Sequence, residues 1–244
     1  MGRFRFKSAS IMYYYRLISS MLKAVISTLG TGLYAVYKAE SNTNDSLGTY
    51  NGTGQGGLTY TAGKSGNAFT FNGSNAYVNL PNNTFNTLTG DFSINMWVKI
   101  ANTGGAQTLL SAFDNVGGQY GIFLFNSGST YFDIYYGGSS VRLSESGVNP
   151  YNTWYMVTVV RKASTSTKIY YNGTLSASNT STANPIYPTT TLSSIGVRKS
   201  TLYGFEYYCG NGTSIDEVNV WNKELTSTEV TELYNAGAGK FYPY

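Results

Sequence analysis

Repeated Asn-Gly pairs constrain this chain more than any other feature of its sequence. They stand at residues 51–52, 72–73, 172–173 and 211–212. Asn-Gly is the strongest short-range signal for a tight β-hairpin turn, because both residues tolerate the positive φ that such a turn needs. Apolar and aromatic runs of strand length lie between the pairs, for example 121–125 and 169–171. The pattern predicts antiparallel strands joined by tight turns.

The composition agrees with an all-β chain. Only 11% of the residues are charged, while the 244 residues include 28 Gly and 23 Tyr. Glycine favours turns, and tyrosine favours the half-buried surface of a sheet. Single all-β domains of this length are common, so we expect one large domain with a sizeable core.

The positive charge is concentrated at the N-terminus. Residues 1–39 contain six basic residues and no acid, whereas residues 40–244 contain ten basic and twelve acidic residues, a net charge of −2. The main body therefore lacks the basic surface of a nucleic-acid-binding domain. We expect no nucleic acid among its partners.

The sequence pattern of the N-terminal arm predicts an amphipathic helix over residues 10–29, which contain no Gly or Pro. Gly30 and Gly32 end it. Four interpretations compete: a signal peptide, a transmembrane helix, a lipid-surface helix, and a helix that packs in an assembly. We favour the assembly helix, because Arg16 and Lys23 interrupt the apolar run and its apolar face suits three or more helices. The expected anchoring residues are Arg3, Arg5, Lys7, Ile11, Tyr14, Ile18, Met21 and Val25.

The C-terminal end predicts a strand over residues 214–222 followed by a short helix. Strict alternation would place Asp216 on the same, inward face as Val218 and Val220. The helix begins with Thr226 three residues before Glu229, which is the spacing of a capping box.

This end resembles the closing segment of the laminin-G-like, concanavalin A-like jelly rolls of bacterial and phage surface proteins. Those domains close with an Ile-Asp-Glu-Val strand and a Leu-Ser-x-x-Glu helix, which match residues 215–218 and 225–230. Further segments resemble the same family in order along the chain, and the resemblance spans residues 33–236. They are residues 37–40, 44–46, 51–52, 63–73, 76–78, 92–98, 154–160, 168–174 and 194–196.

The resemblance implies the architecture. We expect a two-sheet antiparallel jelly-roll sandwich over residues 33–244, preceded by the basic arm and helix of residues 1–32. Trp97, Trp154 and Trp221 stand in predicted strands and should lie in or near the core.

The chain lacks the residues that several kinds of catalysis require. The chain has no histidine, which excludes Ser-His and Cys-His catalysis and His-ligated metals. Its twelve acids are scattered, with only Asp216 and Glu217 adjacent, so a glycosidase carboxylate pair is not expected. Cys209 is the only cysteine and reads as a small buried hydrophobe. We expect a protein that is not an enzyme.

A calcium site is the best candidate for a metal centre. Oxygen donors cluster after the first predicted strand, and related jelly rolls often hold one structural Ca²⁺ where the first and last strands meet. The expected ligands are Glu40, Asn42, Asn44, Asp45 and Asp216. The alternative is an ordinary Asx-rich turn, with Asp216 satisfied by backbone N–H groups.

Tyrosines near Gly-rich turns are the candidate ligand contacts. They could stack on sugar rings, or instead pack between the sheets. The expected ligand-binding residues are Asp114, Tyr120, Tyr135, Tyr136 and Tyr203.

The leading functional hypothesis is a virion decoration or fibre protein. Its arm would bind other virion proteins, a homotrimer being favoured, and its lectin-like head would bind a host-surface glycan. The alternatives are an exported carbohydrate-binding module of the bacterial cell surface and, less favoured, a glycan hydrolase.

Overall fold

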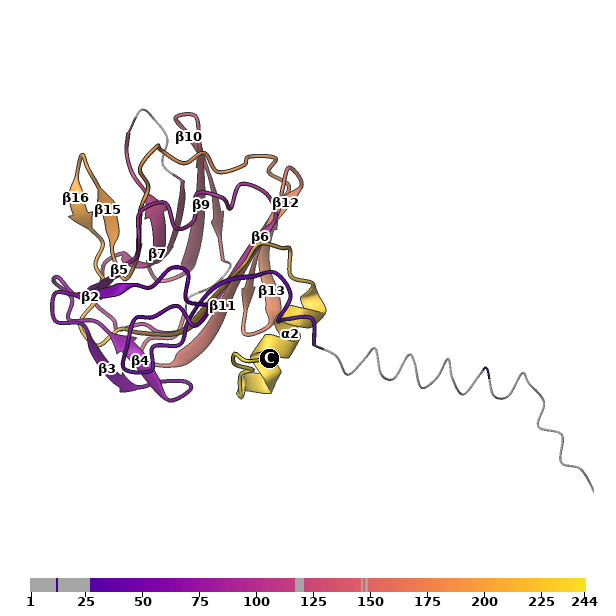
Figure 1. Cartoon of the computed structure of the whole chain (residues 1–244), viewed down its shortest axis with the longest axis horizontal. Helices are drawn as coiled ribbons and strands as arrows, with labels where there is room; N and C mark the ends of the chain where they lie inside the picture. Colours follow the sequence, from indigo (N-terminus) through magenta and orange to yellow (C-terminus); the bar gives the residue numbers. More distant parts are fainter. Residues whose placement is uncertain (1–11, 13–26, 117–120, 146, 148) are drawn as a thin grey trace, which may run out of the picture.

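Two antiparallel sheets pack face to face in a computed structural model that describes Met12, residues 27–116, 121–145, Gly147 and 149–244 (Figure 1). The eight-stranded sheet has the order β13-β12-β11-β6-β17-β4-β3, with β1 also paired to β17. The seven-stranded sheet has the order β10-β9-β8-β7-β14-β5-β2, and β15 and β16 form a separate hairpin. The predicted two-sheet antiparallel sandwich is confirmed.

The eight-stranded sheet is built from β1 (Leu33–Tyr37), β3 (Thr59–Ala62), β4 (Asn67–Thr70), β6 (Phe92–Lys99), β11 (Trp154–Lys162), β12 (Ser166–Tyr171), β13 (Thr174–Asn179) and β17 (Ser214–Trp221). The seven-stranded sheet is built from β2 (Thr53–Gln55), β5 (Tyr77–Asn79), β7 (Gln107–Phe113), β8 (Ile122–Asn126), β9 (Thr130–Tyr136), β10 (Ser139–Ser144) and β14 (Leu192–Ile195). The hairpin consists of β15 (Arg198–Ser200) and β16 (Gly204–Glu206). The helix α2 (Ser227–Tyr234) is followed by a 3₁₀ turn, Asn235–Gly237.

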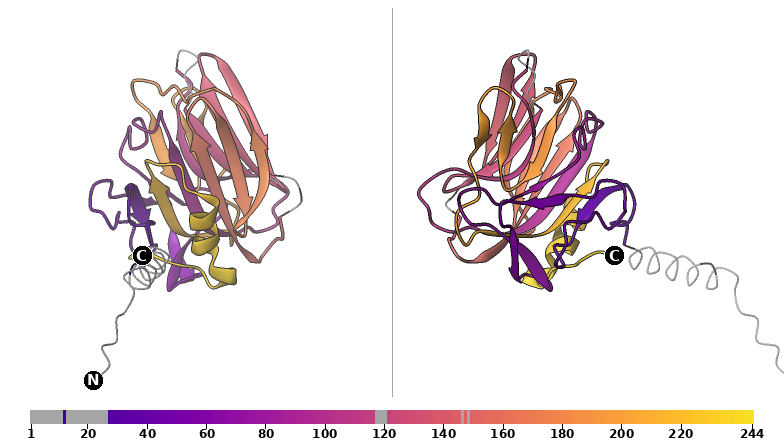
Figure 2. Two further views of the ribbon diagram at one scale, coloured as in Figure 1. Left: turned by 90° about the vertical axis from the view of Figure 1, so that its right-hand side faces the viewer. Right: turned by 60° about the vertical axis from the view of Figure 1, so that its left-hand side comes forward.

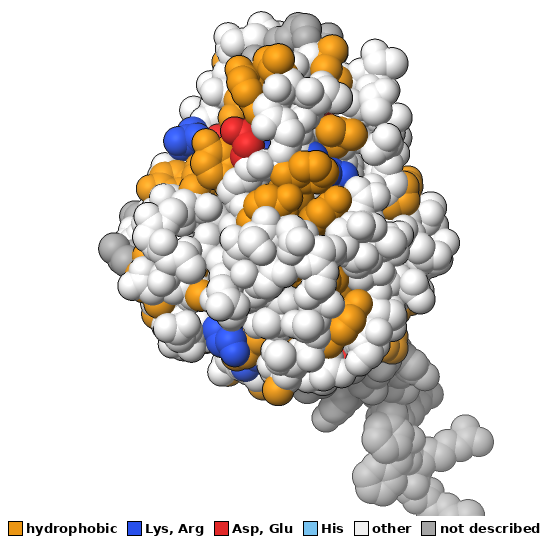
Figure 3. Space-filling view, turned by 90° about the vertical axis from the view of Figure 1, so that its left-hand side faces the viewer, with side chains coloured by type: hydrophobic (Ala, Val, Ile, Leu, Met, Phe, Trp, Pro, Cys, Tyr) orange, Lys and Arg blue, Asp and Glu red, His pale blue; other side chains and the backbone are white. Residues whose placement is uncertain are grey.

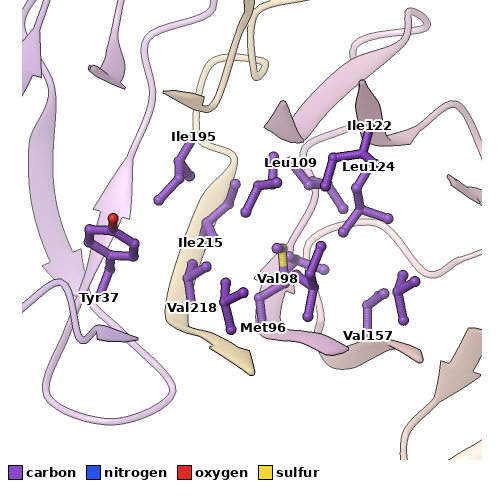
Figure 4. Close-up of a cluster of buried hydrophobic side chains, with 14 of the residues drawn as sticks. Tyr37, Met96, Val98, Leu109, Ile122, Leu124, Val157, Ile195, Ile215 and Val218 are labelled. Atoms are coloured by element: carbon purple, nitrogen blue, oxygen red, sulfur yellow. The ribbon is translucent and has the colours of Figure 1, made fainter. Parts of the chain in front are cut away.

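The core lies between the sheets and follows the two-residue period of the strands. Met96 and Val98 of β6 point inward, and so do Ile122 and Leu124 of β8 in the facing sheet (Figure 4). Each of these four side chains is at most 1% exposed. Burial of alternate apolar residues from both sheets is what holds a sandwich together.

A second apolar cluster covers the outer face of the eight-stranded sheet. Trp97 and Trp221 lie there with Val230 and Leu233 of α2, and all four are buried. Tyr234 stacks on Trp97 with ring centroids 5.9 Å apart. Figure 2 shows α2 lying against this sheet. Trp154 is half-buried beside the same cluster, so the predicted burial of the tryptophans is confirmed.

The predicted direction of Asp216 is wrong. Glu217 has a φ of +49°, and the pairing of β17 with β6 shifts between Asp216 and Asn219. This β-bulge breaks the strict alternation. Asp216 therefore lies opposite Trp97 on the outer face, while Val218 points into the core.

The Asn-Gly pairs lie in two kinds of connection. Asn172 and Gly173, with φ of +48° and +78°, make the tight turn between β12 and β13. The other three pairs lie in connections that carry the chain from one sheet to another. The predicted N-terminal helix, residues 10–29, and its expected anchoring residues lie outside the described residues, apart from Met12 and from residues 27–29, which are not helical.

Candidate functional site

The β15–β16 hairpin stands on the outer face of the seven-stranded sheet and is held there by polar contacts. Lys199 Nζ donates to Asn79 Oδ1 at 2.6 Å. Thr201 donates to Asp114 Oδ1 from its backbone nitrogen at 2.8 Å and from its hydroxyl at 2.9 Å. The hairpin is therefore fixed to β5 and to the end of β7. Burial lowers the pKa of Lys199 to about 8.

The hairpin presents large apolar side chains to solvent. Leu202, Tyr203, Phe205 and Tyr207 are 64%, 60%, 52% and 44% exposed. Phe205 also contacts Tyr77 and Tyr208, with ring centroids 5.5 and 6.3 Å away. Figure 3 shows hydrophobic side chains gathered on this side of the molecule. We call these six residues the aromatic surface, which consists of Tyr77, Leu202, Tyr203, Phe205, Tyr207 and Tyr208.

An aromatic stack with two arginines adjoins this surface, and its Phe123 and Arg198 contact Tyr207 of the surface. Phe123 stacks on Phe125 at 4.5 Å, and Phe125 on Tyr131 at 5.0 Å. The Arg142 guanidinium lies 5.1 Å from the Phe125 ring, and the Arg198 guanidinium lies 5.1 Å from the Phe123 ring. Arginine over aromatic faces fixes both partners.

Each of these arginines also has an acidic partner. Arg142 bonds Asp133 through two contacts of 2.7 Å, which raises the pKa of Arg142. Arg198 bonds Glu206 at 2.7 Å. Because the charges cancel pairwise, this side of the molecule offers flat apolar rings and paired polar groups with little net charge. Such a surface suits a ligand with apolar ring faces and neutral polar edges.

The structure brings three of the predicted ligand residues to this region. Tyr203 lies in the hairpin turn, and Tyr135 lies on the same sheet face, 5.5 Å from the Phe113 ring. Asp114 is only 1% exposed, so its role here is to hold Thr201. Tyr136 follows on the other face of β9, and Tyr120 lies outside the described residues.

The expected ligand-binding residues did not include Phe205, Tyr207 or the two arginines. One signal was available: residues 202–208 contain four aromatic residues within seven, and Tyr203, Phe205 and Tyr207 alternate with Gly204 and Glu206. The partners of Arg142 and Arg198 come from separate strands, and no local pattern indicates them.

The predicted calcium ligands fall into two separate groups. In the first, the Asp45 carboxylate accepts backbone hydrogen bonds from Val36, Leu47, Thr49 and Tyr50 at 2.9–3.1 Å. Asn42 Oδ1 accepts from the backbone nitrogen of Asn44 at 2.9 Å. These contacts are those of an Asx-rich loop.

The second group consists of Glu40 and Asp216, whose carboxylates accept hydrogen bonds from the backbone at the turn between β3 and β4. Asp216 Oδ2 accepts from the backbone of Lys64 at 2.8 Å and of Ser65 at 3.0 Å, and Glu40 Oε2 accepts from that of Asn67 at 3.1 Å. Gly66 is required between them, because its φ is +57° and a Cβ there would lie 2.0 Å from Glu40 Oε1.

The described part of the chain contains no group of three or more acidic or cysteine side chains placed to hold a metal ion. The predicted Ca²⁺ ion, with Glu40, Asn42, Asn44, Asp45 and Asp216 as its ligands, stays a prediction. Burial raises the pKa of Asp216 to about 7, against three backbone donors that lower it.

Cys209 is fully buried, as predicted, and its Sγ donates to the Thr108 carbonyl at 2.9 Å. Burial raises its thiol pKa. Over the described residues, no helix has both the length and the apolar character needed to cross a membrane.

Comparison with solved structures finds the same fold in clostridial-type toxin domains. The binding domain of Paraclostridial Mosquitocidal Protein 1 aligns with a TM-score of 0.69 at 17% identity, covering 86% of this chain and 53% of that one. The botulinum neurotoxin serotype C1 binding domain aligns with a TM-score of 0.67 at 18% identity, covering 86% and 53%. The botulinum neurotoxin DC binding domain in complex with SialylT aligns at 0.66 and 17%, covering 86% and 52%.

This chain thus spans about half the length of those structures, and at such identities the likeness shows a lectin-like fold alone. No curated protein matches the sequence. The sequence pattern of one family, described as the concanavalin A-like lectin/glucanases superfamily of Laminin G type, matches residues 72–231. The chain therefore belongs to the concanavalin A-like lectin/glucanase superfamily.

Proposed function

We propose that this protein is a non-enzymatic adhesion module that binds a cell-surface glycan through the aromatic surface. The observation that carries the proposal is the exposure of Tyr203, Phe205 and Tyr207 on a hairpin that is fixed to a lectin-like sandwich. Exposed apolar side chains gathered in one place mark interaction sites on soluble proteins.

The chemistry of the surface favours a sugar. A pyranose ring has apolar C–H faces that stack on aromatic rings, and hydroxyl edges that need paired donors and acceptors. The aromatic surface supplies the rings, and the Arg198–Glu206 pair supplies donors and acceptors beside them. The similar botulinum neurotoxin DC binding domain forms a complex with SialylT, and cell entry of botulinum neurotoxin type C depends on interaction with two ganglioside molecules, so sialylated glycans are the first probes.

The binding experiment uses the full chain on a glycan array, followed by calorimetry with the best ligand. Phe205→Ala is expected to weaken binding at least about fivefold, because stacking on one ring contributes roughly 1–3 kcal/mol. Leu175→Ala is the matched control, since Leu175 is 50% exposed but belongs to β13. Binding that survives Phe205→Ala and Tyr203→Ala unchanged would place the glycan elsewhere.

The proposal for the whole protein adds attachment to a virion. The basic arm, residues 1–32, would bind other virion proteins and present the head on a capsid, fibre or tail. The alternative is a bacterial cell-surface module exported from the cell. The mass of the mature protein separates the two, because export would remove the start of the arm and virion assembly would retain it.

A further inference from the structure

A pocket lies beside β10 and β13, which are the outermost strands of the two sheets on one side of the sandwich. We call it the edge pocket. Its walls include Glu145, which follows β10, Asn149, and the residues Tyr171 and 174–176 of the β12–β13 hairpin. Its volume of about 320 Å³ is at the small end of the range for small-molecule sites. None of these residues belongs to the aromatic surface.

A buried polar network fixes Glu145 in the wall of the edge pocket. Glu145 and Asn149 are only 7% and 3% exposed, and Thr130 and Tyr155 are fully buried. Asn149 Nδ2 donates to Glu145 Oε2 at 2.8 Å, and the Thr130 hydroxyl donates to Asn149 Oδ1 at 2.9 Å. Asn126 Nδ2 donates to Asn149 Oδ1 at 2.7 Å and to the Tyr155 hydroxyl at 3.2 Å. Residues of both sheets therefore hold the carboxylate in place before a ligand arrives.

The charge of Glu145 has no cationic partner in the described part of the chain. None of the ion pairs there includes Glu145, and the hydrogen-bond donors among those residues reach only its Oε2 atom. The second oxygen, Oε1, is left for a ligand in the pocket. A largely buried carboxylate gains most from a positively charged donor, because such a donor supplies a hydrogen bond and also compensates the charge.

The hairpin side of the edge pocket suits the body of a sugar. Tyr171 is half-buried and packs on Tyr155, with ring centroids 5.3 Å apart. Burial and the charge of Glu145 raise the pKa of Tyr171, so its hydroxyl stays a neutral donor. Thr174 and Ser176 add two more hydroxyl groups to this wall. An aromatic ring beside hydroxyl groups matches a pyranose, which has apolar ring faces and polar edges.

We propose that the edge pocket is a second ligand site, which binds an amino sugar by its ammonium group. The ammonium donates a hydrogen bond to Glu145 Oε1, and the sugar ring lies along Tyr171 with its hydroxyls toward Thr174 and Ser176. Binding at this site does not require the aromatic surface, so the two proposals can fail independently.

Calorimetry with the full chain tests the site at slightly acidic pH, where the amine of glucosamine is protonated. Glucosamine should bind at least about tenfold more tightly than N-acetylglucosamine, whose amide lacks the charge. Glu145→Gln keeps an acceptor for Asn149 and should reduce the affinity for glucosamine to that for N-acetylglucosamine. Glu224→Gln, which alters a partly exposed acid that pairs with Lys162 and Lys168, is the matched control and should behave like wild type.

A second variant keeps the test decisive if Glu145→Gln does not fold. Thr174 is exposed and lies outside the polar network that holds Glu145, so Thr174→Trp should narrow the edge pocket while leaving the sandwich intact. It should weaken glucosamine binding at least about tenfold. Glucosamine binding that neither variant changes, or equal affinity for the two sugars, would overturn the proposal.

Two further measurements identify the ligand and its place. Phe205→Ala should leave glucosamine binding unchanged, whereas a loss would move the amino sugar to the aromatic surface and overturn the edge pocket. Lysine with its α-amino and carboxyl groups blocked should bind more weakly than glucosamine, because it lacks the ring and hydroxyls. Equal affinity for this blocked lysine would overturn the assignment to a sugar and favour a lysine side chain.

Discussion

Three buried carboxylates in this protein show how far the backbone decides the behaviour of one chemical group. Asp45 accepts four backbone N–H bonds, Asp216 accepts three, and Glu217 accepts none. The sequence predicts that Asp216 is buried in the last strand, because strict alternation places it on one face with Val218 and Val220. It cannot predict the bulge at Glu217, since a positive φ in a non-glycine residue depends on the pairing with β6.

Asp216→Asn should lower the free energy of unfolding by about 3 kcal/mol, because an amide cannot replace the carboxylate at all three backbone donors. Urea denaturation measures the loss. Asp91→Asn, which changes the acceptor of one exposed hydrogen bond from the backbone of Ala163, is the control and should cost little.

The same pair of measurements in calcium and in EDTA tests the metal prediction. The family resemblance predicts a larger loss for Asp216→Asn in calcium than in EDTA. An equal loss in both media would assign the whole effect to the backbone hydrogen bonds and remove the calcium site.

Among the strands and helices, those that the local sequence determines were predicted correctly, and the hairpin that contacts with distant residues hold was not. The strand over residues 92–98 and the one over 154–160 agree with β6 and β11 to within two residues. The capping box of α2 is present, with Thr226 and Glu229 bonded reciprocally, because four consecutive residues determine it. The β15–β16 hairpin was not predicted, since contacts with Asn79 and Asp114 of distant strands hold it.

The charge of Glu229 should stabilise α2 in a pH-dependent way. Burial raises its pKa, but hydrogen bonds from Lys223, Thr28 and Thr226 outweigh burial and hold the pKa at about 2. Since the folded pKa is depressed, this stabilisation is complete above pH 4.5 and is lost as the pH falls to 2.

Glu229→Gln keeps the capping box and removes the charge. It should cost about 1–2 kcal/mol at pH 7 and nothing near pH 2, as measured by urea denaturation at both pH values. Glu232→Gln, in a half-exposed pair with Lys240, is the control. A loss that does not change with pH would show that the charge contributes nothing.

For the whole molecule, the order of weak motifs predicted the sandwich correctly because most of the motifs are strands that follow one another as in the family. The folded domain begins before residue 33, where the family resemblance begins. Leu29 is fully buried against the outer cluster, its carbonyl accepts from Trp221 Nε1 at 2.7 Å, and Thr28 donates to Glu229 at 2.6 Å. The residues just before β1 therefore pack with the body.

Two truncations separate the arm from the body. A chain that starts at Ser27 should be a stable monomer, whereas one that starts at Gly32 should melt at a lower temperature, because burial of Leu29 contributes about 2 kcal/mol. Light scattering of the full-length chain should give a trimer if the arm assembles. A full-length monomer would show that the arm docks onto another protein or a membrane instead.

The proposed binding surface on the β15–β16 hairpin lies apart from the core of the sandwich. The side chains that fill the sandwich interior and those of the aromatic surface are different sets, joined mainly through Asn79 and Asp114. If the aromatic surface binds a glycan as proposed, changes in the turn between β15 and β16 would alter the ligand that is bound at little cost in stability. Under selection to bind changing targets, the turn between β15 and β16 could change repeatedly during evolution while the sandwich remains the same.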